Sequence, residues 1–235
     1  ASNSLINNLG NATASGRATG NFGENLLAAN DDGFVSVSNL TGIFGHGLNF
    51  FGTTYQGLYI NNNGNVTFGG GLATYTPLPI SQGSANPIIA PFWSDIDTRV
   101  NAGTLTPGGN SLGTNILYYD LDSTNRVMTI TWDDVARFNQ LTGASNAFQL
   151  QLISQGNGDF DIIFRYESIT WTYPQDPGGT AINHARMGFS SGSGVGNVSY
   201  ELPGSGTTAV GDLDTLLGNS GIAGVYIYQV RGGQV

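Results

Sequence analysis

The chain has 235 residues, no cysteine, and seven arginines but no lysine against 16 acidic residues, which gives a formal net charge of −9. Without cysteine, neither a disulfide framework nor thiolate chemistry is possible, and without lysine neither Schiff-base catalysis nor a Lys–Asn isopeptide bond can occur. Phosphate binding needs a basic surface, so nucleic acid is excluded as an expected partner and cations are the natural counterpart.

The start of the chain and its hydropathy are typical of an exported product. No apolar run approaches the roughly 20 residues that cross a bilayer, so we expect no membrane span. Residues 1–4 lack the features of a signal peptide, and the small Ala1 suits the end that a signal peptidase leaves. We therefore expect a secreted or cell-surface protein whose export signal has been removed.

Residues 1–29 are rich in Asn, Ala and Gly and carry scattered apolar side chains without a long alternating run. We interpret them as an N-terminal arm or lead-in segment. Residues 30–235 show neither a tandem repeat nor a linker, so we expect them to form a single domain.

From about Phe34 onward, short β-forming runs alternate with turn signals, as in a sandwich or barrel. Residues 57–60 and 65–68 predict a hairpin around Asn63-Gly64, because an Asn-Gly pair favours the positive φ angles of a type I′ turn. Two further hairpins are expected from the strand pairs 115–121 with 126–132 and 148–153 with 160–167.

Apolar and polar side chains alternate strictly in these strands, so we expect one face in a core and the other in water, with Glu167 on the water-facing side. Other strands are expected at residues 88–93, 185–190, 198–202 and 225–230. Only residues 212–217 favour a short helical turn, with Asp212 as its cap. The sequence therefore predicts an all-β fold, an antiparallel β-sandwich of short strands with little or no helix.

Five segments, in order along the chain, carry a resemblance to a known family. The most specific is Pro87–Arg99, PIIAPFWSDIDTR, and the others are residues 50–55, 58–68, 146–153 and 158–167. Together they resemble the nidogen-like extracellular (NIDO) domain over about residues 31–202. The resemblance implies an extracellular location and a part in adhesion or matrix architecture, no reaction and no specific ligand residues. The lysine-free, Asn/Gly-rich composition looks more like that of a bacterial secreted member.

Asp95 and Asp97 are two residues apart, so on a strand both carboxylates would project from one face. Such a pair faces solvent, shares an arginine such as Arg99, or holds a cation. Calcium takes six to eight oxygen ligands, and carboxylates, Asn side chains and backbone carbonyls are what this chain offers. Asp95 and Asp97 are therefore the first candidate calcium ligands.

Asn30-Asp31-Asp32-Gly33 is a second oxygen-rich turn, which lacks the spaced ligands of an EF-hand. An Asx-turn before a strand at Phe34 would explain it without a metal. Asp31 and Asp32 are the second pair of candidate calcium ligands. Asp133-Asp134 is interpreted as a polar strand end.

We expect no catalytic residues and a non-enzymatic protein. His46 and His184 are far apart in the sequence, and neither a zinc-protease nor a serine-hydrolase motif is present. A glycosidase needs a carboxylate pair of which one has a raised pKa, and only three glutamates occur. A polysaccharide hydrolase is therefore the least supported of the three function classes considered.

The main alternative to a structural or adhesive module is a calcium-dependent, lectin-like module that binds glycans. Trp171 and Tyr173 flank a Pro/Gly-rich loop, where one ring could stack on a sugar or could instead anchor the loop to the core. Trp93 and Trp132 have strand phases that favour the core.

Self-assembly into an oligomer or fibre is the expected mode of a structural module. Residues 225–230 are strongly β-forming and uncharged, and only the adjacent charge of Arg231 would disfavour pairing with another chain. An open sheet edge offers unpaired N–H and C=O groups to another strand. We therefore expect residues 1–29 and 225–230 to make contacts between copies, unless the first segment wraps its own domain and the second is an internal strand.

Overall fold

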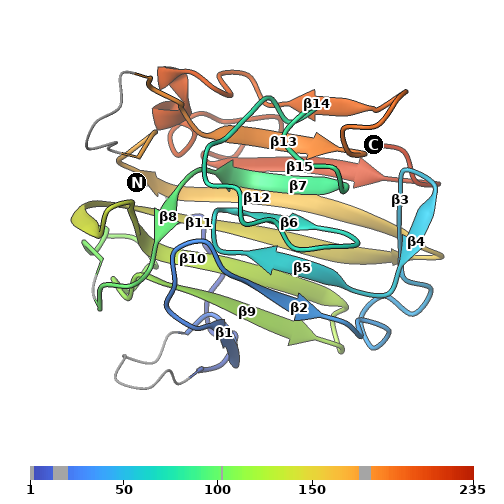
Figure 1. Cartoon of the computed structure of the whole chain (residues 1–235). Coiled ribbons are helices and arrows are strands. Elements are labelled where there is room, and N and C mark those ends of the chain that lie inside the picture. The colour runs from blue at the N-terminus through green and yellow to red at the C-terminus, as the bar shows by residue number, and fades with distance from the viewer. Residues whose placement is uncertain (1–2, 13–20, 102, 175–180) are drawn as a thin grey trace.

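The computed structural model describes residues 3–12, 21–101, 103–174 and 181–235. Two antiparallel sheets lie face to face (Figure 1), which confirms the predicted all-β sandwich. The one regular helix in these ranges is a 3₁₀ turn, η1 (Thr208–Asp212). Thr207 caps this turn and Asp212 is its last residue. The Asp212 carbonyl then accepts from the N–H groups of Thr215 and Leu216, both at 3.0 Å, so a single helical turn also begins at Asp212, as predicted.

The larger sheet has seven strands. Six of them follow the order β1-β9-β10-β11-β12-β15, and the seventh, β8, pairs with β10 outside this order. Their bounds are β1 (Asn25–Leu27), β8 (Ile96–Asp97), β9 (Ile116–Asp122), β10 (Val127–Arg137), β11 (Leu141–Gly156), β12 (Asp159–Ile169) and β15 (Val225–Val230). The three central strands β10, β11 and β12 have 11, 16 and 11 residues, longer than the sequence predicted, because pairing continues past irregularities in the register.

The smaller sheet has six strands in the order β14-β13-β7-β6-β5-β2. Their bounds are β2 (Phe34–Val37), β5 (Leu58–Asn61), β6 (Asn65–Thr67), β7 (Ile88–Trp93), β13 (Arg186–Ser190) and β14 (Ser199–Glu201). A separate hairpin of β3 (Leu48–Phe50) and β4 (Thr53–Tyr55) lies at one end of the sandwich (Figure 1).

The hairpin turns differ from the expected types. Asn157 and Gly158 both have positive φ, 54° and 86°, and join β11 to β12 as a type I′ turn. Between β5 and β6 only Gly64 has positive φ, and three residues lie between the paired Asn61 and Asn65. This is a type I turn with a bulge, so the type I′ assignment here was wrong. A Cβ at Gly64 would collide with the carbonyl oxygen of Phe92, so β7 passes directly against this turn.

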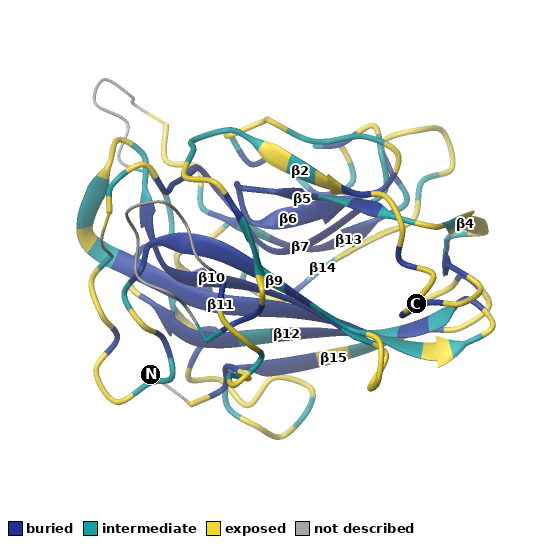
Figure 2. Cartoon of the chain, turned by 90° about the horizontal axis from the view of Figure 1, so that it is seen from below, coloured by how far each residue is buried: buried dark blue, intermediate teal, exposed yellow. Residues whose placement is uncertain are grey.

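The main core lies between the two sheets, whose facing surfaces are buried (Figure 2). Trp132 of β10 stacks on Phe148 of β11 with ring centroids 4.9 Å apart, and Phe92 of β7 contacts Phe148 at 5.3 Å. All three side chains are fully buried. Burying one such side chain stabilises the fold by about 1.5–3 kcal/mol, so these contacts hold the sheets together.

Much of the outer face of the larger sheet, over β9, β10 and β11, is also covered, so the expectation that this part of the sheet faces water was wrong. Leu5, Ala12 and Phe22 form a second core with residues of β9 and β11. Gln149 Nε2 donates to the Ile6 carbonyl, and Gln149 Oε1 accepts from the Ile6 N–H. The described parts of the predicted arm thus pack on their own domain, while a boundary at residue 29 stays a prediction and residues 13–20 lie outside the described ranges.

Acidic side chains hold a loop onto this outer face. Glu167 is fully buried and accepts from the N–H groups of Asn110 and Ser111, both at 2.8 Å. Asp133 and Asp134 are buried inside β10 and accept N–H groups of residues 112–114. The interpretations of Glu167 as water-facing and of Asp133-Asp134 as a strand end were therefore wrong, because the loop brings the N–H donors that satisfy these carboxylates.

The strand β15 forms an edge of the larger sheet, but side chains already bond to some of the main-chain groups along its free edge. Asn219 Nδ2 donates to the Ile227 carbonyl at 2.7 Å, and Asn219 Oδ1 accepts from the Ile227 N–H at 2.8 Å. Ser220 Oγ donates to the Val225 carbonyl at 2.6 Å. These side chains take the place of a neighbouring strand. In the described ranges we find no helix with the length and apolar character to span a bilayer.

Candidate cation site

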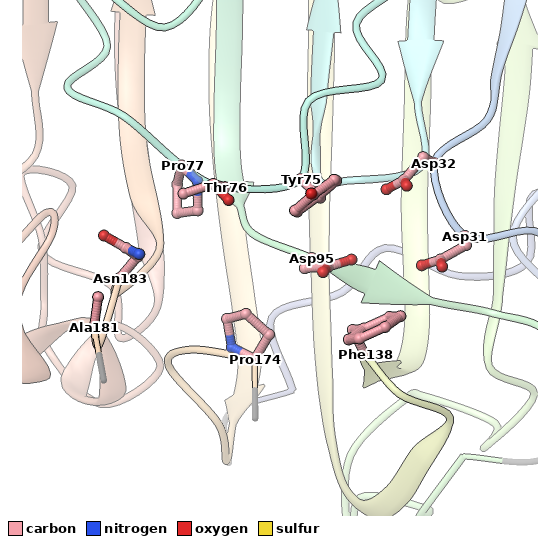
Figure 3. A pocket seen from close by; sticks show the side chains of 10 residues that line it. All are labelled: Asp31, Asp32, Tyr75, Thr76, Pro77, Asp95, Phe138, Pro174, Ala181 and Asn183. Atoms are coloured by element: carbon pink, nitrogen blue, oxygen red, sulfur yellow. The ribbon is translucent and has the colours of Figure 1, made fainter. Parts of the chain in front are cut away.

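Three carboxylates that are distant in the sequence converge at one end of the sandwich. Asp31 and Asp32 lie in the turn before β2, and Asp95 lies between β7 and β8. Each residue contributes an oxygen, and these oxygens all lie within 4.8 Å of one another. Asp31 and Asp32 line one side of a pocket of about 390 Å³ and Asp95 its middle, and the other walls include Tyr75, Pro77, Phe138, Pro174 and Asn183 (Figure 3).

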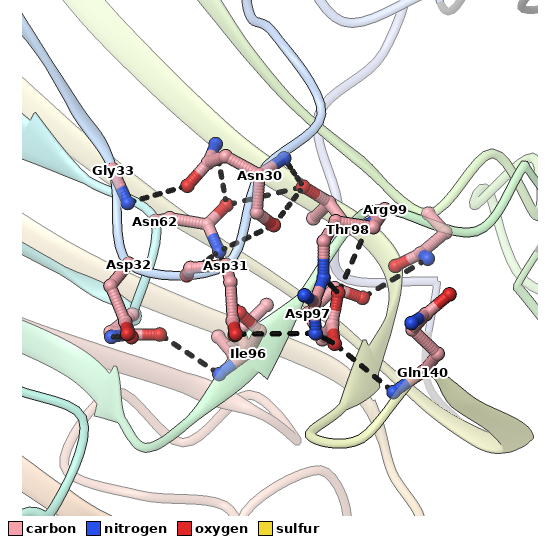
Figure 4. Close-up of polar contacts among 12 residues, drawn as sticks. Asn30, Asp31, Asp32, Gly33, Asn62, Ile96, Asp97, Thr98, Arg99 and Gln140 are labelled. Carbon is pink, nitrogen blue, oxygen red and sulfur yellow. Dashed lines mark hydrogen bonds and ion pairs between the residues drawn. The ribbon is translucent and has the colours of Figure 1, made fainter.

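The turn between β5 and β6 holds the acidic segments in place. Asn62 Nδ2 donates to the carbonyl oxygens of Asp31 and Ile96, both at 2.6 Å (Figure 4). Asn63 Nδ2 donates to Asp32 Oδ1 at 2.8 Å, and Asn63 Oδ1 accepts from the Ile96 N–H at 2.9 Å. Both asparagines are buried, so these bonds fix the positions from which the carboxylates project.

The turn around Asp31 and Asp32 is itself capped by a side chain, as the sequence predicted. Asn30 Oδ1 accepts from the Gly33 N–H at 2.6 Å. The Asn30 carbonyl accepts from the Thr98 N–H at 2.9 Å, which ties the turn to the segment after β8. The Asx interaction and the acidic cluster are therefore both present, and the first orients the second.

The structure separates the first candidate pair. The fully buried Asp97 binds Arg99 through both oxygens, with Oδ1 to Nε at 2.8 Å and Oδ2 to Nη2 at 2.5 Å, and also accepts from the Gln140 N–H (Figure 4). Of the alternatives offered by the sequence, solvent, an arginine or a cation, Asp97 therefore has the arginine. Asp95 lies before the two-residue strand β8, so the strand spacing that would align it with Asp97 does not apply. Arg99 also contacts Asp31 Oδ2 at 3.2 Å.

The site is short of positive charge. Asp95 is only 6% exposed. Among the described residues, no N–H or hydroxyl group donates to its Oδ1 or to the buried Oδ1 of Asp31, and the only group that these two carboxyls offer each other is a shared proton. Burial and the neighbouring carboxylates of Asp31, Asp32 and Asp97 raise the pKa of Asp95 to about 8. Burial, with Asp97 and Asp32, raises the pKa of Asp31 to about 6, although Arg99 opposes this. A bound cation would supply the missing partner for these oxygens.

The aromatic candidates occupy different environments. Trp171 is buried, its Nε1 donates to the Val135 carbonyl at 3.1 Å, and its ring packs edge-on against Phe92. The structure therefore contradicts the sugar-stacking hypothesis for Trp171 and supports its role as a loop anchor. Tyr173 is half-buried and packs edge-on against His184. Pro174, which follows Tyr173 and which the sequence did not single out, lines the acidic pocket, as do Ala181 and Asn183 of the same connection between β12 and β13.

Comparison with known protein families identifies the family of this chain. A family model described as "Nidogen-like domain" matches residues 56–232, about three quarters of the chain. The chain belongs to the nidogen-like domain family. This confirms the resemblance drawn from the sequence, and the match continues beyond residue 202, where that resemblance stopped, through β15.

The nidogen-like domain is similar to parts of much longer animal proteins. It is 30% identical to mouse alpha-tectorin over 79% of this chain, 31% identical to dendrite extension defective protein 1 of Caenorhabditis elegans over 79%, and 30% identical to Drosophila melanogaster nidogen over 78%. The chain covers only 9%, 16% and 14% of those proteins. No solved structure matches it. Membership of the family supports the expectation of an extracellular matrix module.

Proposed function

We propose that this nidogen-like domain is a non-enzymatic adhesive module of an extracellular matrix, and that it contacts its partner through a calcium ion held by Asp31, Asp32 and Asp95. The observation that carries the proposal is the buried Oδ1 of Asp95, which lies among two other carboxylates without an N–H or hydroxyl donor in the described ranges. The similarity to alpha-tectorin and nidogen supports a matrix role. The buried carboxylates of Asp133 and Glu167 accept backbone N–H groups, so both have structural partners.

Calcium fits the donors better than other common metals. Carboxylate oxygens are hard ligands, and the described cluster contains neither histidine nor cysteine. Calcium binds oxygens at 2.3–2.6 Å, so ligands on opposite sides of one ion lie up to about 5 Å apart. The three aspartate oxygens, all within 4.8 Å of one another, meet this limit. Magnesium demands shorter bonds and a near-ideal octahedron, which three carboxylates on two separate segments supply less readily.

Thermal unfolding in increasing Ca²⁺ tests the proposal. A ligand at about 100 times its Kd stabilises the folded state by about 2.7 kcal/mol, which corresponds to a Tm rise of about 5–10 °C for a chain of this size. Extracellular calcium modules have Kd values of about 0.1–1 mM, so titration to about 100 mM reaches 100 times Kd across this range. Asp95→Asn should abolish the rise, whereas Asp212→Asn, which removes the same charge from an exposed residue, should keep it. An unchanged Tm in the parent chain would overturn the calcium site.

Self-assembly is a second proposal, for which we choose the edge at β14 in place of the edge at β15. Because Asn219 and Ser220 partly close β15, we propose another edge of a sheet, β14 with the residue before it, where Val198 is 52% and Tyr200 42% exposed. Strand addition at β14 would join copies through main-chain hydrogen bonds. Light scattering at increasing concentration tests this, and a chain that stays monomeric with and without Ca²⁺ would refute it.

A further inference from the structure

A calcium ion held by the three aspartates would keep open coordination positions. Asp31 Oδ2 already contacts Arg99, and Asp32 Oδ1 accepts from Asn63, so each of these carboxylates has one oxygen left for an ion. Asp95 adds one or two more. The protein thus supplies three or four oxygens, and Ca²⁺ takes six to eight.

Three main-chain carbonyl groups near the cluster already accept hydrogen bonds, so they are not free to fill these positions. The carbonyls of Asp31 and Ile96 accept from Asn62, and the carbonyl of Asn30 accepts from Thr98. Two or more oxygens on the ion must therefore come from water or from a ligand in the pocket.

The charge around the ion favours a neutral ligand. Asp97 is neutralised by Arg99, so the three cluster carboxylates and one Ca²⁺ leave a single negative charge on a chain whose formal net charge is −9. This potential repels a carboxylate, sulfate or phosphate on a partner. Neutral hydroxyl groups can take the open positions without that cost.

The remaining walls have the composition that a sugar ring requires. Pro77 and Asn183 lie across the pocket from Asp31 and Asp32, with Asp95 between the two sides (Figure 3). Pro77 and Pro174, which both line the pocket, present apolar surfaces for the C–H groups of a ring. Tyr75, which is 54% exposed, and Asn183 add polar groups that can bond further hydroxyls. A volume of about 390 Å³ falls within the range of small-ligand pockets.

We infer that this pocket binds a neutral glycan, with two adjacent hydroxyl groups of one sugar completing the coordination of the calcium ion while Tyr75, Pro174 and Asn183 contact the ring. The inference rests on the calcium site proposed above and names the partner of that site. It also moves the expected glycan contact from Trp171, which is buried, to the side chains around the acidic cluster.

Calorimetric titration of the chain with methyl α-mannoside, methyl β-galactoside and L-fucose tests the inference, together with an array of neutral and anionic oligosaccharides. We expect a neutral sugar to bind in 5 mM Ca²⁺ and to be released by EDTA. Tyr75→Ala and Asn183→Ala should weaken binding at least tenfold and leave the calcium-dependent rise in Tm unchanged. Asn125→Ala, which removes an exposed asparagine outside this pocket, should bind as the parent does.

The outcomes separate the two proposals. A Tm that rises with Ca²⁺ while no neutral sugar binds would overturn the glycan inference and keep the calcium site. Binding of anionic oligosaccharides alone, or sugar binding that persists in EDTA or is unaffected by Tyr75→Ala and Asn183→Ala, would also overturn it. A Tm that does not respond to Ca²⁺ would remove both proposals.

Discussion

Replacing Asn62 by alanine tests whether the β5–β6 turn builds the acidic site. The side chain donates two hydrogen bonds of 2.6 Å, a buried one to the carbonyl oxygen of Ile96 and a partly buried one to that of Asp31. Leaving a buried carbonyl without its donor costs about 1–3 kcal/mol, so the loss of both predicts a decrease of about 3 kcal/mol in the free energy of unfolding. For a chain of this size, this lowers the Tm by about 6–12 °C. Since Asp31 and Asp95 lose their shared support, Ca²⁺ affinity should also fall about tenfold.

Urea unfolding in EDTA measures the first effect, and the calcium titration of Tm measures the second. The matched control is Asn125→Ala, because Asn125 is exposed and its Nδ2 makes one bond, to Asp122 Oδ2 at 2.7 Å. That variant should lose less than about 1 kcal/mol. If Asn62→Ala is no less stable than Asn125→Ala, the assigned role of Asn62 is wrong.

Three further predictions address the rest of the fold. Phe22→Ala should cost about 3–5 kcal/mol in urea unfolding, because Phe22 of the N-terminal segment is fully buried against β9, and Phe34→Ala, 47% exposed in the parent, should cost far less. Burial and the neighbouring Glu24 raise the pKa of Asp120 from 3.8 to about 7. Between about pH 4 and pH 7 the folded state therefore keeps a proton that the unfolded state releases, so the free energy of unfolding falls as the pH rises through this range. Asp120→Asn should reduce that fall by about 2 kcal/mol, and an unchanged pH profile would contradict the assignment. Asn219→Ala should open the β15 edge and cause concentration-dependent association in light scattering.

The strands could be predicted from the sequence because alternation with a period of two is a local property. The observed bounds of β7 and β15 are the predicted ones, residues 88–93 and 225–230, and the three expected hairpins all form. The turn type was not fixed in the same way. Asn-Gly occurs at residues 63–64 and at 157–158, and only the second forms a type I′ turn, because the first must let β7 pass against Gly64.

The covered outer face could not be predicted, because alternation shows which side of a strand is polar and not what lies against that side. Gln149 is fully buried and bonds to Ile6, 143 residues away, and Glu167 bonds to Asn110, 57 residues away. Polar side chains on this face have buried partners in place of water. No local pattern distinguishes the two cases.

The candidate site shows the same limit. The sequence supplied all three clustered aspartates as candidates, yet it paired Asp95 with Asp97 because strand spacing was the only geometric information it offered. The pairing with Asp31 depends on the asparagines at positions 62 and 63, which the sequence identified only as part of a turn. Their side chains reach segments about 30 residues away on either side, and this contact has no periodic signal.

The position of the cluster connects cation binding to the stability of the whole sandwich. Asp95 lies where the chain leaves β7 of the smaller sheet and enters β8, which pairs with β10 of the larger sheet. Trp132 of β10 donates its Nε1 to the carbonyl of Asn62, so the turn that supports the aspartates is also tied to the larger sheet, at 3.1 Å. A calcium ion at Asp31, Asp32 and Asp95 would therefore join the crossover to the edge of the smaller sheet. Because the ion would bind these segments only when both sheets are folded, its binding free energy adds to the stability of the whole sandwich, and unfolding of the chain measures it.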